Sequence, residues 1–173
     1  MKDLLKVSSG NSKLTSRNIF SIPAGLTCPK AKLCKSWASV INGKSQIVDG
    51  DETLFRCYAA SQEAQYPAVR DNRMSNFKAI LKALRKGNAV ELIDKSINKN
   101  LKLTRIHESG DFFSLDYLKA WLEVSRRNPD NIFYCIHLFV PLYLIYVVSF
   151  VLLFYLYFFH DIVSYILFVF QDP

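Results

Sequence analysis

The sequence predicts an α/β fold, a partial parallel sheet with crossover helices, over residues 1–134, followed by one long apolar helix. Strand-like segments at residues 101–107 and 132–134 flank a helical pattern over residues 114–128. This order of elements builds parallel sheets with right-handed connections. A charge boundary divides the chain, because all 22 Lys and Arg residues lie at or before Arg127. The chain therefore joins two chemically different parts.

The first elements are short and separated by turns. Residues 8–18 are polar and predict a loop, and residues 19–22 predict a short strand that a Pro-Ala-Gly turn closes. Asn-Gly and Asp-Gly dipeptides bracket residues 44–48 and predict a hairpin on the surface. No catalytic residue is expected in this hairpin.

A longer helix follows, because apolar residues recur at helical spacing. They are Met74, Phe77, Ile80, Leu81 and Leu84. Asp71 or Ser75 caps the start of this helix, and Gly87 ends it. Its other face carries Arg73, Lys78, Lys82, Arg85 and Lys86. The pattern is typical of a solvated helix face, and the alternative is the phosphate-binding surface of a basic nucleic-acid-binding module. Residues 89–97 predict a second short helix.

The tail over residues 135–173 is dominated by apolar residues, with no Asp, Glu, Lys or Arg before Asp161. Residues 138–159 are long enough to cross a bilayer as a helix, since about 20 residues span roughly 30 Å of hydrocarbon. Arg126 and Arg127 precede this segment and only acids follow it. The positive-inside rule therefore predicts a single-pass membrane protein with a basic cytoplasmic head. A buried core segment is the alternative.

The loop after the strand at residues 101–107 holds the candidate catalytic and substrate-binding residues. They are Arg105, His107, Glu108, Ser109, Gly110 and Asp111. His107 titrates near neutral pH, and Glu108 and Asp111 are candidates for an acid, a base or a ligand. Ser109 and Gly110 let the backbone approach a ligand, and Arg105 is suited to pair with a carboxylate. Ligands bind at such strand ends in parallel α/β folds. The alternative is a structural loop with a buried, hydrogen-bonded His107.

Three cysteines of the head are candidate metal ligands. Cys28, Cys34 and Cys57 do not match the usual structural zinc spacing, which pairs cysteines two to four residues apart. They could hold an iron–sulfur cluster with one open iron position, or zinc with His107 as the fourth ligand. The alternative is three buried free thiols. No signal peptide is expected at the N-terminus, so the cysteines of a cytoplasmic head are expected to be reduced.

Six blocks of the head resemble a known family in the order in which they occur. They are Asn11–Leu14, Phe20–Gly25, Thr27–Pro29, Leu33–Cys34, Phe55–Ala64 and Arg105–Phe113. The sequence resembles the phage gene product 88 domain family from about residue 10 to residue 134. The resemblance implies no established activity. It implies that the three cysteines, together with His107, Ser109, Gly110 and Asp111, are the functional residues.

The resemblance ends after Tyr134. Family members continue with Ala-Tyr-Thr and a polar remainder, whereas this chain continues with Cys135-Ile136-His137 and the apolar tail. These three residues can be encoded by TGC-ATA-CAC, which read one nucleotide later gives GCA-TAC-AC followed by any base and encodes Ala-Tyr-Thr. We therefore hypothesise that a frameshift replaced the C-terminal part of the family. In that case we expect the truncated chain to be poorly stable, aggregation-prone or membrane-targeted, with little or no activity. If the tail is an artefact of the sequence, we expect the protein to be cytoplasmic.

Overall fold

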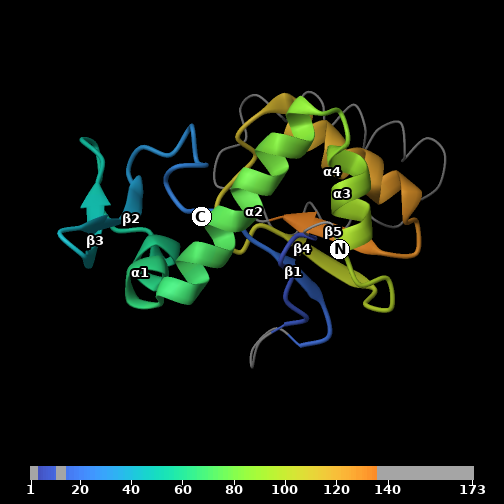
Figure 1. The fold of residues 1–173 in the computed structure, drawn as a ribbon, viewed down its shortest axis with the longest axis horizontal. Helices are drawn as coiled ribbons and strands as arrows, with labels where there is room; N and C mark the ends of the chain where they lie inside the picture. The colour runs from blue at the N-terminus through green and yellow to red at the C-terminus, as the bar shows by residue number, and fades with distance from the viewer. Residues whose placement is uncertain (1–3, 11–14, 136–173) are drawn as a thin grey trace, which may run out of the picture. The chain divides into compact units, whose positions relative to one another are not determined.

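The computed structural model describes residues 4–10 and 15–135 of the 173-residue chain. Three short strands form a parallel sheet in the order β1-β4-β5 (Figure 1). They are β1 (Asn18–Phe20), β4 (Leu103–Ile106) and β5 (Ile132–Cys135). The central strand is β4, although two strands and three helices separate it from β1 along the chain.

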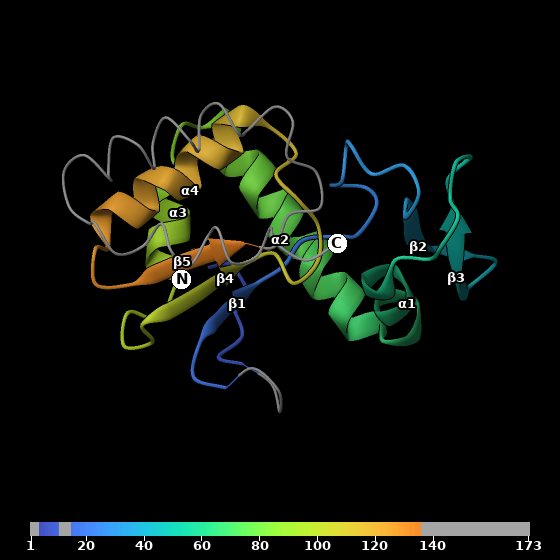
Figure 2. The same cartoon turned by 180° about the vertical axis from the view of Figure 1, so that it is seen from behind.

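Four helices lie in the described part of the chain. They are α1 (Tyr58–Gln65), α2 (Pro67–Arg85), α3 (Ala89–Ser96) and α4 (Leu115–Arg127). Helices α2, α3 and α4 pack against one another on one side of the parallel sheet (Figures 1 and 2). The largest buried side chains of this core are Phe20, Ile22, Ile80, Ile93, Tyr117, Trp121 and Val124. The rings of Phe20 and Trp121, whose centroids are 5.4 Å apart, join the sheet to α4.

The β4–α4–β5 segment is the strand, helix and strand that the sequence pattern indicates. Ser114 caps α4, because its Oγ accepts a hydrogen bond from the backbone N–H of Tyr117 at 3.3 Å. The buried face of α4 includes Leu118 and Trp121, as expected from their spacing. Leu115, in the first turn of α4, is 42% exposed.

A separate antiparallel hairpin pairs β2 (Ser36–Ile41) with β3 (Lys44–Asp49). Its turn contains Asn42 and Gly43, whose φ values of 52° and 74° match the twist of a two-residue hairpin. The hairpin packs against α1. Sequence patterning located the second strand and the turn but not β2, whose side chains do not alternate cleanly between apolar and polar.

The fold class predicted from the sequence is wrong in two respects. The fold is a mixed α/β arrangement with an antiparallel sheet beside the parallel one. Within residues 4–10 and 15–135, no helix is both long enough and apolar enough to cross a membrane. The longest of these helices, α2, is amphipathic and carries five basic residues, which are Arg70, Arg73, Lys78, Lys82 and Arg85. Residues 138–159, predicted as a membrane helix, lie outside the described residues.

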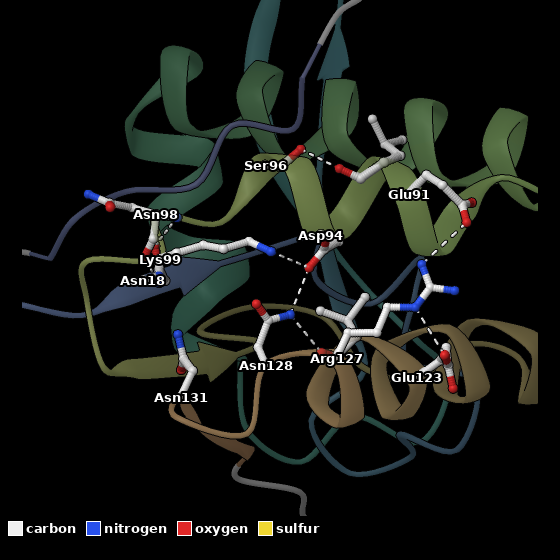
Figure 3. Close-up of polar contacts among 12 residues, drawn as sticks. Asn18, Glu91, Asp94, Ser96, Asn98, Lys99, Glu123, Arg127, Asn128 and Asn131 are labelled. Atoms are coloured by element: carbon white, nitrogen blue, oxygen red, sulfur yellow. Dashed lines mark hydrogen bonds and ion pairs between the residues drawn. The ribbon is translucent and has the colours of Figure 1, made fainter.

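Polar side chains fasten the amino ends of the parallel strands (Figure 3). Asn18 Nδ2 in β1 donates to the carbonyl oxygen of Asn98 at 3.0 Å and to Oγ1 of Thr104 at 3.2 Å. Thr104 Oγ1 in turn donates to Oδ1 of Asn131, also at 3.0 Å. Nearby, Asp94 accepts hydrogen bonds from Lys99 and Asn128. These hydrogen bonds connect the three parallel strands at their amino ends. The candidate site lies at the opposite, carboxyl end of the sheet.

Candidate functional site at the carboxyl end of the parallel sheet

Two loops lie side by side where β1 and β4 end. The backbone N–H groups of His107 and Glu108 both donate to the carbonyl oxygen of Phe20, at 3.1 and 3.2 Å. Ile22 N–H donates to the carbonyl oxygen of Ser109 at 3.1 Å. His107 has a positive φ of 69°, an uncommon backbone conformation for a residue with a side chain. The predicted loop therefore lies at the strand end expected for ligand binding.

Gly110 occupies the closest approach between these loops. Its φ is 84°, and a Cβ there would lie 2.5 Å from Oγ1 of Thr27 and 2.9 Å from the carbonyl oxygen of Ile22. Thr27 is itself held, because its Oγ1 donates to the carbonyl oxygen of Pro23 at 2.6 Å. Only glycine fits this position. The sequence suggested that Gly110 lets a ligand approach the backbone, but the neighbour that fills this space is the loop after β1.

Glu63 of α1 connects the two loops to the helices. Its side chain is 2% exposed, and its Oε1 accepts three hydrogen bonds at 3.0 Å each. The donors are the backbone N–H of Ala24, the Oγ of Ser109 and Nη1 of Arg73. One carboxylate therefore holds the loop after β1, the loop after β4 and α2 together.

Arg73 completes this buried network from α2. Its side chain is 4% exposed, and it also donates to the carbonyl oxygen of Ala59 at 3.3 Å and to Oε1 of Gln62. Oε2 of Glu108 lies 3.8 Å from Nη2 of Arg73, so Glu108 joins the network from its edge. The prediction that Arg73 lies on the solvated face of the helix is wrong. The charge is buried because Glu63 neutralises it.

His107 lies in an aromatic environment beneath the loop. Its Nε2 is 2.8 Å from the hydroxyl oxygen of Tyr117, and its ring centroid is 4.7 Å from that of Phe112. Complete burial raises the pKa of the Tyr117 hydroxyl, an effect that Trp121 partly opposes, so this hydroxyl stays protonated at neutral pH. His107 thus contributes to the core, and its acid/base role stays a prediction.

The three candidate metal ligands lie on three separate segments. Cys28 follows β1, Cys34 precedes β2, and Cys57 is the residue before α1; all three are half-buried free thiols. Burial raises the pKa of the Cys28 thiol to about 12, with the Gly25 backbone opposing and Asp111 and the other two thiols adding to the increase. Burial and the proximity of Cys57 also raise the pKa of Cys34. Ser36 connects two of these segments, because its Oγ accepts a hydrogen bond from the backbone N–H of Cys57 at 2.9 Å and donates to the carbonyl oxygen of Cys34 at 3.4 Å.

The remaining predicted site residues are distributed differently. Asp111 also accepts a hydrogen bond from the backbone N–H of Phe112 at 2.6 Å. Arg105 lies between Thr104 and Ile106 in β4, and its side chain points to the opposite face of the sheet from theirs. Its Nε is buried without a hydrogen-bond partner among the described residues. The role of Arg105 in substrate binding stays a prediction.

Sequence reasoning missed Glu63 as a site residue. The burial of the Glu63 carboxylate and its pairing with Arg73 depend on how separate segments of the chain pack together, which local sequence patterns do not reveal. The available signal was its position inside the block Phe55–Ala64, which the resemblance already marked. In that block, Cys57 is the N-cap residue of α1, and Glu63 lies six residues later within the same helix.

The fold and the site define an α/β domain with a loop cluster at the carboxyl end of a parallel sheet. The sequence profile of the family described as "Gene product 88" matches residues 3–135, and the chain belongs to this family. A curated relative, the Gene 88 protein of Mycobacterium phage L5, is 35% identical over 83 residues. The match covers 43% of this chain and 34% of the relative, so it spans about a third of the relative's length. No solved structure matches the chain.

Proposed function

We propose that this protein carries part of a metal-dependent enzyme site in which Cys28, Cys34 and Cys57 bind zinc or an iron–sulfur cluster. The observation that carries the proposal is that Ser36 bonds the backbone of both Cys34 and Cys57, while Gly25, three residues before Cys28, packs closely against the carbonyl oxygen of the same Ser36. Thiolates are the ligands that zinc and iron–sulfur clusters prefer.

The donor chemistry suits such a group, although the thiols are not arranged as a finished metal centre. Among the described residues, no set of three or more His, Cys, Asp or Glu side chains has metal-binding geometry. A half-buried thiol with a pKa of about 12 stays neutral at pH 7, and a bound cation favours its deprotonation. Metal binding would therefore require the thiols to move from the positions that they have in this structure.

The residues around the thiols would have separate tasks. A bound metal would supply Lewis-acid or electron-transfer chemistry at this strand end. Asp111, whose charge contributes to raising the pKa of the Cys28 thiol, is the proposed acid or base, and the Glu63–Arg73 pair holds its loop in place through Ser109. The buried His107 fixes the start of that loop through its bond to Tyr117.

The test is metal analysis of the full chain after anaerobic expression with iron, sulfide and zinc available. We expect bound metal that is lost when Cys28, Cys34 or Cys57 is replaced by Ser. Cys135→Ser tests the fourth thiol, because burial and Asp111 raise the pKa of Cys135 as well; unchanged metal content in this variant would show that Cys135 is not a ligand. Iron with acid-labile sulfide would identify a cluster, and colourless protein with zinc would identify a zinc site. Folded protein that takes up neither would refute the proposal.

A further inference from the structure

One face of α2 carries four exposed cations and no acid. The four are Lys78, Lys82, Arg85 and Lys86, which we call the α2 basic stripe. They are spaced by four, three and one residues, so they share a face of the helix and its C-cap. No Asp or Glu occurs between Asp71 and Glu91. The stripe is therefore a local concentration of positive charge on a chain of net charge +7.

The structure does not neutralise this charge internally. Among the described residues, none of the ion pairs includes a member of the stripe. Lys78 and Lys82 are four residues apart, as are Lys82 and Lys86, so neighbouring charges repel one another. Cations in the last turn of a helix interact favourably with the helix dipole, and this interaction partly compensates the charges of Lys82 and Arg85. Lys78 lies further from the end, where the dipole gives little compensation.

We propose that the α2 basic stripe binds the phosphate backbone of double-stranded nucleic acid. The stripe spans about 12 Å along the helix, since eight residues rise by roughly 1.5 Å each. Such a row of cations binds phosphates without reading sequence. The other two cations of α2 take no part in the stripe, because Arg70 pairs with Asp71 and Arg73 is turned inward to Glu63. The stripe is therefore separate from the network that holds the loops of the cysteine site.

The surroundings of the stripe favour a duplex over other polyanions. Binding to an anionic membrane uses apolar side chains that insert beside the cations, and none of the exposed large hydrophobic residues lies between Pro67 and Lys86. Binding to single strands uses exposed aromatic rings on which bases stack. The one aromatic residue of α2, Phe77, is instead partly buried against Phe113, with ring centroids 5.2 Å apart.

The test measures binding of the full chain to a fluorescent 25-base-pair DNA duplex at 50 to 200 mM salt by anisotropy. The variant is Lys78→Gln with Lys82→Gln. The matched control is Lys44→Gln with Lys95→Gln, which removes the same charge from exposed positions in β3 and α3. The salt slope is the decrease of the logarithm of the binding constant with the logarithm of the salt concentration, and two lost phosphate contacts should reduce it by about 1.8. Between 50 and 200 mM salt, the variant should therefore lose about tenfold less affinity than the natural sequence loses. The control should keep the slope of the natural sequence.

Several results would overturn the proposal. They are absence of duplex binding at 50 mM salt, an equal change of slope in the stripe variant and in the control, tighter binding to a single strand of the same sequence, and binding only to phosphatidylserine vesicles. Far-UV circular dichroism checks that the variants fold. A Lys78→Arg, Lys82→Arg variant keeps the charge, so it should retain the slope, and a loss of slope there would also contradict the phosphate-contact model.

Discussion

Replacing Glu63 by Gln should destabilise the fold by about 3 kcal/mol. Two unit charges 3.0 Å apart attract by about 5–6 kcal/mol at an effective dielectric constant of 20, and burial of both groups offsets part of this. Removing one partner of a buried pair typically costs about 3–5 kcal/mol, because the other charge stays buried. Gln keeps an oxygen that can accept from Ala24 and Ser109, so we expect the lower end of this range.

The assay is urea unfolding of the full chain at pH 7, followed by far-UV circular dichroism. The series comprises Glu63→Gln, Arg73→Met and the double variant. Because the double variant leaves no buried charge uncompensated, it should cost less than the sum of the single changes. Arg70→Met is the control on the same helix. Its ion pair with Asp71 is 3.1 Å long, but Asp71 is exposed, so the loss should be below about 1 kcal/mol.

Two results would refute this reasoning. If Glu63→Gln costs no more than Arg70→Met, the carboxylate does not hold the loops. If the double variant costs the full sum of the single changes, Glu63 and Arg73 act independently despite their contact. Hydrogen exchange at the Ala24 amide gives a second readout, because this N–H donates to Glu63 at 3.0 Å and should exchange faster in Glu63→Gln.

Further predictions concern single residues of the same region. Gly110→Ala should lower the free energy of unfolding by more than about 2 kcal/mol, whereas Gly87→Ala, at φ 68° in open space, should cost about 1 kcal/mol; urea unfolding compares them. The Cys28 thiol has a pKa of about 12 when folded and about 9 when exposed, so the unfolded chain deprotonates first. Stability should therefore fall as the pH rises from 9 towards 12, less steeply in Cys28→Ser; an unchanged slope would contradict the burial of this thiol. Tyr117→Phe should cost about 1–2 kcal/mol by unfolding measurements, because His107 loses a buried hydrogen bond, and a neutral effect would show that this bond contributes nothing.

Local patterns sufficed for the elements whose partners are close in the sequence. The β4–α4–β5 segment was predictable because the strand, the Ser114 cap and the helix follow one another directly. The position of β1 next to β4 was not, since pairing of Asn18 with Thr104 joins segments that are far apart along the chain. The strand β2 was missed for a different reason: it is half-buried against α1, and its pattern carries no clear period of two.

The candidate site shows the same division between local and distant information. The position of the His107–Asp111 loop followed from the strand that precedes it, and the structure places that loop against the loop after β1. The inward turn of Arg73 could not be predicted, because a basic residue on an amphipathic helix is normally solvated. Only the approach of Glu63 from α1 makes its burial tolerable.

The arrangement separates the residues that hold the loops from those proposed to bind metal. Glu63 fastens both loops through Ala24 and Ser109, and this network contains no cysteine side chain. Cys57 is held through its backbone N–H, which donates to Oγ of Ser36 at 2.9 Å, so its thiol is not needed for that bond. Replacing a thiol by a hydroxyl should therefore leave the loops in place. Loss of metal in a cysteine variant that unfolds like the natural sequence would then report on ligation and not on misfolding, whereas loss of metal in Glu63→Gln would follow from displaced loops.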